Sequence, residues 1–173
     1  MADIVPAKRA LPGARFALTK FRPMTLPDTL VARPELHERL TAGAGKRLTV
    51  VVGSAGAGKS VLLSSWAATR PPGLTSWLSC EKADADPVRY WAGFIEALRV
   101  VAPGFGADAA DLLALDGTMS ADVTASIAND AAKLPAGSAI IVDDLPAADR
   151  RRVQAGGPVR DDEVSARRAD GPG

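Results

Sequence analysis

Three glycines, a lysine and a serine lie close together in residues 53–60 (GSAGAGKS), with the spacing G-x-x-x-x-G-K-[ST]. This spacing is typical of a loop that binds nucleotide phosphates. Its glycines are expected to adopt φ > 0 and to bring backbone N–H groups close to an anion. Lys59 is expected to reach the β- and γ-phosphates, and the Ser60 hydroxyl is expected to ligate Mg²⁺. The predicted phosphate-binding residues are Gly53, Ser54, Ala55, Gly56, Ala57, Gly58, Lys59 and Ser60.

The segments on either side of this loop agree with that interpretation. Residues 48–52 (LTVVV) are apolar and β-branched and predict a buried strand, whereas residues 59–69 have the pattern of a helix. A helix that starts at the loop directs its positive end toward bound phosphates. The alternative is a glycine-rich turn with an incidental lysine, and the strand-loop-helix context favours the phosphate site.

A second group of chemical interest consists of Asp143 and Asp144, which directly follow the apolar residues 139–142 (AIIV). A carboxylate at the end of a buried strand beside the phosphates can hold Mg²⁺, usually through the water shell of the ion. We therefore predict Asp143 as a metal-binding residue and Asp144 as the catalytic group that orients or deprotonates an attacking water. The alternative is a strand that runs into an Asx turn.

The rest of the sequence predicts the strands and helices that must position the glycine-rich loop and the two acids. Residues 75–79 predict a further strand, and residues 33–40 predict a short helix that residues 42–45 end. Asp86 and Ser120 are expected to cap two more helices. Alternating strands and helices predict an α/β fold, a P-loop NTPase core with a parallel sheet of about three strands flanked by helices. This sheet is expected to be incomplete.

Three regions are expected along the chain. Residues 1–45 form an N-terminal arm and a short helix, residues 46–147 form the nucleotide-binding core, and residues 148–173 form a tail. The tail contains no Leu, Ile, Phe, Met, Trp or Tyr, so it is expected to be disordered. Residues 150–152 (RRR) are the one candidate nucleic-acid patch, but nearby acids cancel their charge.

Composition excludes several classes of function. The formal net charge is +1 over 173 residues, which gives no global basic surface for nucleic acid. Cys80 is the single cysteine, so no internal disulfide is expected. The first residues lack the apolar core of a signal peptide, and no apolar run has the length of a membrane span. We expect a cytoplasmic protein with no membrane partner.

Four stretches resemble the large ATP-binding LuxR-family transcriptional regulators, which belong to the STAND class of P-loop ATPases. The first stretch joins residues 19–23 (TKFRP) and 30–36 (LVARPEL). The second, residues 54–60, is similar to the family pattern S-A-P-A-G-[FY]-G-K-[ST], with one residue fewer and no proline. The third, residues 77–79 and 84–91 (WLS and DADPVRYW), resembles the family signature W-L-S-L-D-x-x-D-N-D-P-x-R-F-W. Asp143 and Asp144 match the acid pair of the family.

This resemblance implies a Mg-ATP-binding switch with slow or no hydrolysis, at most a slow ATPase. It also implies ATP rather than GTP and places Arg33 near the base and ribose, although an exposed arginine at a helix start explains Arg33 equally well. The likeness ends after Leu145, and the further domains of the family, including the helix-turn-helix, are not seen. We therefore expect a truncated chain, as a shifted or prematurely ended reading frame would produce, with self-association or a partner protein as candidates. Two alternatives remain: a non-functional or partner-dependent fragment, and a small P-loop kinase or ATPase.

Seven other residues have structural explanations. His37, the only histidine, is expected on a helix surface, and Cys80 is expected to be a small packed residue. Trp77 and Trp91 could stack on a base, but their strand and helix positions favour core packing. The acids Glu81, Asp84 and Asp86 lack the spacing of a calcium loop, and helix capping and solvation are expected to account for them.

Overall fold

The computed structural model describes residues 16–27 and 29–145 of the chain. Within this part the element order is η1 (Leu18–Phe21), α1 (Pro34–Ala44), α2 (Lys59–Ala68), β1 (Thr75–Ser79), η2 (Lys82–Ala85), α3 (Pro87–Leu98), α4 (Ala107–Asp116), α5 (Ala121–Ala131) and β2 (Ala139–Asp143). None of the helices in these described residues is both long and apolar enough to cross a membrane. The predicted tail, residues 148–173, and most of the predicted arm lie outside the described residues.

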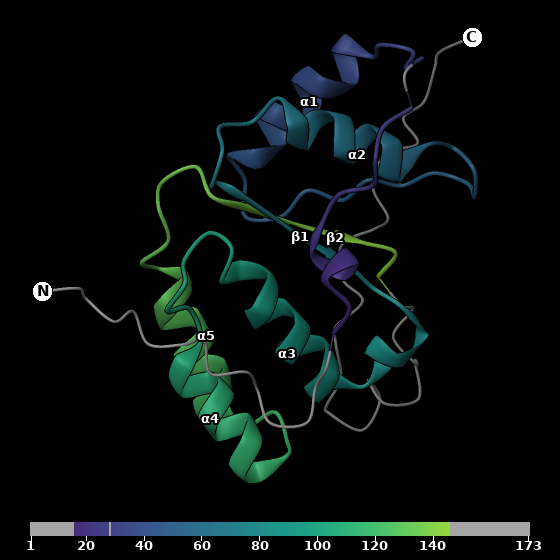
Figure 1. Cartoon of the computed structure of the whole chain (residues 1–173). Helices are drawn as coiled ribbons and strands as arrows, with labels where there is room; N and C mark the ends of the chain where they lie inside the picture. The colour runs from purple at the N-terminus through teal and green to yellow at the C-terminus, as the bar shows by residue number, and fades with distance from the viewer. Residues whose placement is uncertain (1–15, 28, 146–173) are drawn as a thin grey trace, which may run out of the picture.

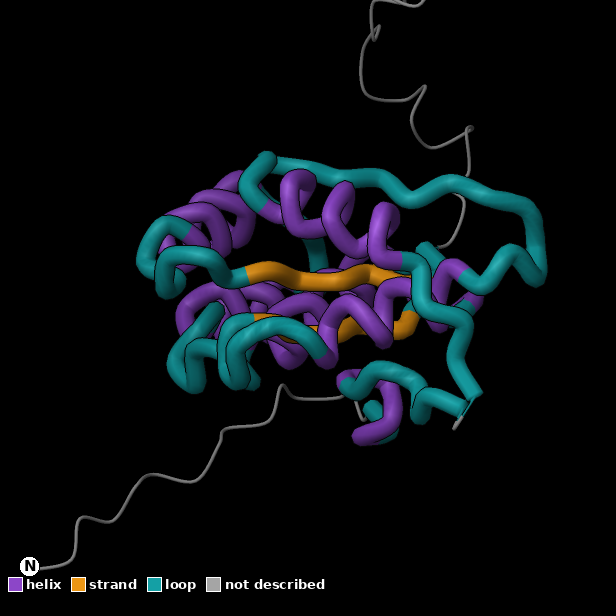
Figure 2. The backbone as a smooth tube through the Cα atoms, turned by 90° about the horizontal axis from the view of Figure 1, so that it is seen from above, coloured by secondary structure: helices purple, strands orange, loops and turns teal. Residues whose placement is uncertain are grey.

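The sheet consists of β1 and β2, which are parallel and pair in register from Thr75 with Ala139 to Ser79 with Asp143. Figure 1 shows α1 and α2 on one side of the two strands and α3, α4 and α5 on the other. The same layers are seen from above in Figure 2. The α/β class with a parallel sheet and flanking helices is therefore confirmed, and it is compatible with a P-loop-like fold.

Side chains alternate between the two faces of the sheet, as the pleat requires. Trp77 and Ile141 pack with Leu40 of α1 and Trp66 of α2. Leu78 of β1 faces the opposite layer and packs with Ala97 of α3. A larger core lies beyond α3, where Ile95, Leu98, Phe105, Ala109, Leu113, Val123 and Ile127 are buried together. Core packing of Trp77 is confirmed, and Trp91 is partly buried against the larger core.

The expected strand over residues 48–52 is wrong, and the sheet has two strands in the described residues rather than about three. Leu48, Val50 and Val52 are 78%, 70% and 88% exposed. Only Val51 of this run packs partly against the cluster around Trp66. The physical reason is that a strand needs a neighbour for its backbone groups, and in the described residues no strand pairs with residues 48–52.

The first helix differs from the prediction at its end. Residues 42–45 were expected to stop it after Leu40, but α1 continues through Gly43 to Ala44. A Cβ at Gly43 would lie 2.6 Å from Thr49 Oγ1, and that hydroxyl donates a 2.8 Å hydrogen bond to the Gly43 carbonyl. The glycine therefore permits a close approach of the following segment rather than breaking the helix.

The helix caps at Asp86 and Ser120 are confirmed. The Asp86 carboxylate accepts a hydrogen bond from the Arg89 N–H at 2.9 Å, and the Ser120 hydroxyl accepts from the Val123 N–H at 3.3 Å. Helix α4 was not predicted, because its segment has no polar cap. Its N-cap is instead Gly106, which has φ 64° and whose N–H donates to Asp130 of the neighbouring α5.

Candidate functional site

The glycine-rich loop leads directly into α2, as its sequence predicts. Gly56 and Gly58 have φ values of 76° and 77°, in the left-handed region that favours glycine. Gly53 does not, so the expectation of φ > 0 at all three glycines is wrong there. A Cβ at Gly53 would lie 3.3 Å from the Ala57 Cβ, so this glycine serves the close packing of the loop on itself.

The side chain of Lys59 closes the loop. Its Nζ donates hydrogen bonds to the carbonyl oxygens of Gly53 and Ser54, each at 3.0 Å. The Ala57 N–H donates to the same Ser54 oxygen at 3.2 Å. The ammonium group is therefore held against the loop, next to the backbone that the sequence assigns to phosphate binding.

The first turn of α2 offers unpaired hydrogen-bond donors. Gly58 caps the helix without a side-chain hydrogen bond. In the part of the chain that the structure describes, the N–H groups of Gly58, Lys59 and Ser60 donate to no acceptor. Unpaired N–H groups at a helix start, together with the helix dipole, attract an anion. The loop thus has the donors and the charge that a phosphate group requires.

The two strand-end acids lie where the sequence places them, at the end of β2. Asp143 is buried, and its backbone oxygen accepts a 2.8 Å hydrogen bond from the Cys80 N–H. Asp144 is exposed and has φ 53°, the one left-handed non-glycine residue in the described ranges. Across residues 16–27 and 29–145, no hydrogen bond or ion pair joins either acid to Lys59 or Ser60. The loop and the strand-end acids are therefore not connected by a direct contact.

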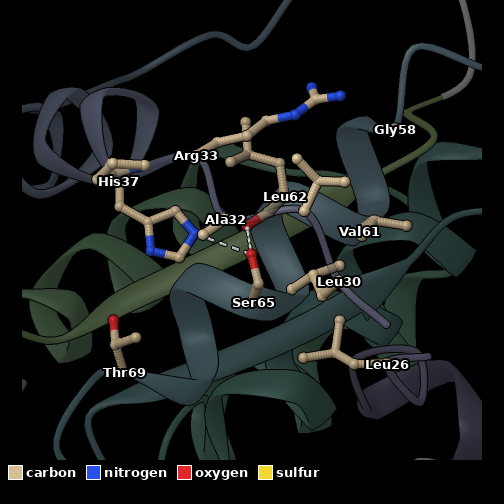
Figure 3. A pocket seen from close by; sticks show the side chains of 12 residues that line it. Leu26, Leu30, Ala32, Arg33, His37, Gly58, Val61, Leu62, Ser65 and Thr69 are labelled. Atoms are coloured by element: carbon tan, nitrogen blue, oxygen red, sulfur yellow. Dashed lines mark hydrogen bonds between the residues drawn. The ribbon is translucent and has the colours of Figure 1, made fainter. Parts of the chain in front are cut away.

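A pocket of about 550 Å³ lies beside the start of α2. Its walls come from the chain before α1, from α1 and from α2, as Figure 3 shows. The lining residues are Leu26, Leu30, Val31, Ala32, Arg33, Pro34, His37, Gly58, Val61, Leu62, Ser65 and Thr69. Most are apolar, and Gly58 belongs to both the pocket and the phosphate-binding loop. Arg33, the predicted nucleotide contact, lies at the N-cap of α1 and lines this pocket.

Sequence reasoning missed His37 and Ser65 as pocket residues. His37 Nε2 and the Ser65 hydroxyl are 2.8 Å apart (Figure 3), and neither side chain is fully exposed. His37 lies on helix α1 and is partly exposed, as expected, and it also has a hydrogen-bond partner that the sequence did not indicate. Helical spacing contained the signal, since His37 is four residues after Arg33 and Ser65 is seven after Gly58, which places each pair on one helix face.

Charged residues after β1 form, with Lys20, a partly buried group that the sequence did not indicate. Lys20 of η1 pairs with Asp84 and lies 3.5 Å from Glu81, and Arg89 lies 3.4 Å from Asp84. The expected capping role of Asp84 is confirmed, because its carboxylate accepts a 2.7 Å hydrogen bond from the Glu81 N–H at the start of η2. Its side chain is 1% exposed, so the expectation that it is solvated is wrong. The hydrogen bond from Arg89 and the nearby Lys20 charge lower the pKa of Glu81. The cluster attaches the N-terminal segment to the end of β1, and the described residues contain no group of three or more His, Cys, Asp or Glu side chains that could hold a metal ion.

Comparison with known proteins gives partial similarities. No family model matches the chain. The chain is 32% identical over 87 residues to the serine/threonine-protein kinase PknK of Mycobacterium tuberculosis, which covers 49% of this chain and 8% of PknK. It is 35% identical over 83 residues to the HTH-type transcriptional regulator MalT of Serratia proteamaculans, covering 48% of this chain and 9% of that protein. The MalT protein of Yersinia enterocolitica is 31% identical over the same length. The chain spans under a tenth of the length of these relatives, and its similarity is to one segment of large regulatory proteins.

Proposed function

We propose that this chain is a Mg-ATP-binding module of a STAND-class transcriptional regulator, in which the nucleotide acts as a conformational switch with slow or no hydrolysis. The observation that carries the proposal is the joining of two features at Gly58. On one side is a loop with two left-handed glycines and unpaired N–H groups. On the other is an apolar pocket of about 550 Å³, a size suited to a small-molecule ligand.

Each part of the loop has a role in this proposal. The N–H groups of Gly58, Lys59 and Ser60 surround the phosphates, and the Lys59 ammonium moves from the loop carbonyls toward them. Arg33, at the N-cap of α1, contacts the sugar or base of the nucleotide. The partial similarity to the MalT proteins, named as HTH-type transcriptional regulators, supports a regulatory rather than a metabolic role.

The Mg²⁺ site rests on the Ser60 hydroxyl and the Asp143 carboxylate, two oxygen ligands of the type that this ion prefers. Bound Mg²⁺ would neutralise charge on the phosphates. The fit of these residues to the ion follows from their donor chemistry; Asp143 is the last residue of β2 and Ser60 lies in the first turn of α2. Asp144, exposed beside Asp143, is the residue that would orient a water if hydrolysis occurs.

The Lys59→Ala variant tests the proposal. Lys59 holds its charge at the loop, so its loss removes charge-assisted hydrogen bonds to the phosphates. We expect the Kd for Mg-ATP, measured by titration calorimetry, to rise on the order of 100-fold. Lys46→Ala is the matched control, because Lys46 is an exposed lysine shortly before the loop. Equal affinity in wild type and Lys59→Ala would refute the site.

A further inference from the structure

The segment before the glycine-rich loop has the side-chain pattern of a strand. Three alternate apolar side chains are 78%, 70% and 88% exposed, namely those of Leu48, Val50 and Val52. The two residues between them face the protein. Thr49 donates a hydrogen bond to the carbonyl of α1, and Val51 packs partly against the core cluster shared by α1, α2 and the sheet. This alternation indicates an extended backbone with one covered and one exposed face.

The backbone of this segment has no partner within the described part of the chain. There, no hydrogen bond reaches an N–H or carbonyl group of residues 48–52. Strand β2 has its ladder with β1 and does not pair with this segment. The segment (LTVVV) also lacks the charged residues and prolines that prevent pairing at exposed strand edges. A strand that pairs with residues 48–52 therefore comes from outside the described residues.

A second copy of this segment matches the first when the two run antiparallel about Val50. In this register Val50 lies opposite Val50 of the second copy, and Leu48 lies opposite Val52. Each exposed apolar side chain then has an apolar cross-strand neighbour, an arrangement that stabilises a strand pair. A centre one residue later sets Leu48 opposite Ser54, and a centre one residue earlier sets Val52 opposite Lys46. The register about Val50 is thus the one that matches all three apolar side chains.

Charge favours antiparallel over parallel pairing of the two copies. Lys46 and Arg47 are exposed immediately before the segment. In a parallel, in-register pair each of these side chains would lie opposite its own copy, and like charges directly opposite destabilise a strand pair. In the antiparallel register they lie opposite Ser54 and Gly53, which carry no charge. An antiparallel pair of identical segments also has two-fold symmetry, the symmetry of a dimer.

We propose that residues 48–52 are the interface of a homodimer, in which the segments of two copies pair as antiparallel strands about Val50. The pairing supplies the backbone hydrogen bonds that the single chain lacks, as in other cases of strand addition. It also brings the two rows of exposed apolar side chains together. The proposal specifies a surface and a partner, and it does not depend on nucleotide binding.

The first test is the mass of the 173-residue chain, measured by sedimentation velocity without nucleotide at chain concentrations up to about 1 mM. Wild type is expected to shift from monomer to dimer as the concentration rises. Val50→Lys sets two lysines opposite each other, so we expect the dimer dissociation constant to rise roughly 10-fold or more. Leu115→Lys is the matched control, because Leu115 is 80% exposed on α4, on the other side of the sheet (Figure 1).

Cysteine substitutions test the register. Cys80 is the single natural cysteine and is buried, so each introduced thiol is the accessible one. Val50→Cys is expected to form a disulfide-linked dimer under mild oxidation. Val52→Cys alone is not, because the two copies of position 52 would lie about 14 Å apart along the strands, beyond the reach of a disulfide. A mixture of Leu48→Cys and Val52→Cys is expected to cross-link again.

The outcomes that would overturn the proposal are specific. A wild-type chain that stays monomeric at every concentration, or a dimer that Val50→Lys does not weaken, would show that residues 48–52 are not the interface. Equal cross-linking of Val50→Cys and Val52→Cys would overturn the antiparallel register. Thermal melts by circular dichroism show whether each variant is folded, and the cysteine pattern provides the result if Val50→Lys does not fold.

Discussion

Two apolar runs, residues 48–52 and 139–142, have similar sequences and different surroundings. Both are rich in β-branched residues, and both lead into a predicted part of the nucleotide site. Residues 139–142 lie in β2, paired with β1 and covered by helices, whereas residues 48–52 form no strand and expose Leu48, Val50 and Val52. The comparison teaches that an apolar run becomes a strand only when a neighbour supplies its ladder and a layer covers its faces.

The consequence for the site is an asymmetry between its halves. The acid-bearing half rests on a hydrogen-bonded strand, which fixes Asp143 to the end of β1 through Cys80. The loop-bearing half is held mainly by α2 and by the partly buried Val51. We expect phosphate binding to order the loop half more than the acid half.

The largest difference in stability is expected between matched side-chain truncations in residues 139–142 and in residues 48–52. Ile141→Ala removes a side chain that is 6% exposed and packed with Trp66 and Trp77, and we expect it to lower the free energy of unfolding by about 3 kcal/mol. Leu48→Ala removes a side chain of the same size that is 78% exposed, so we expect a change below about 0.5 kcal/mol. Urea unfolding of both variants measures the difference. Equal losses would show that residues 48–52 are buried like β2.

A smaller effect is expected from the buried ion pair that holds η1 against the end of β1. Lys20→Met leaves the Asp84 carboxylate buried with Arg89 as its remaining partner, and we expect the free energy of unfolding to fall by about 2 kcal/mol. Lys82→Met, an exposed lysine of η2, is the control and should have little effect. A Lys20→Met protein as stable as wild type would mean that Asp84 does not depend on η1.

The smallest effect concerns the thiol of Cys80, the residue whose backbone N–H donates a hydrogen bond to Asp143 of β2. Burial, with a contribution from Asp84, raises the pKa of Cys80 from its ordinary value of 9.0 to about 11. The folded state therefore holds this proton more tightly than the unfolded state, and the associated stability is complete below pH 9.0 and is lost as the pH rises toward about 11. Urea midpoints across that range should fall slightly more for wild type than for Cys80→Ala. Parallel curves would contradict the shift.

Sequence alone determined the features that depend on neighbouring residues. The glycine-rich loop, the start of α2 at Lys59, the caps at Asp86 and Ser120 and the strand before Asp143 follow from turn, capping and periodicity rules that act over a few residues. The same local rules could not decide whether residues 48–52 would be a strand. That outcome depends on which distant segment pairs with β1.

Tertiary structure alone decided the contacts between segments that are distant in sequence. Lys20 meets Asp84 across 64 residues, and His37 meets Ser65 across 28, by docking of η1 and α1 onto the core. Because of these contacts, Asp84 is buried rather than solvated. His37 lines the pocket and has a hydrogen-bond partner. Burial and hydrogen bonding are properties of the assembled layers, so no spacing within one segment specifies them.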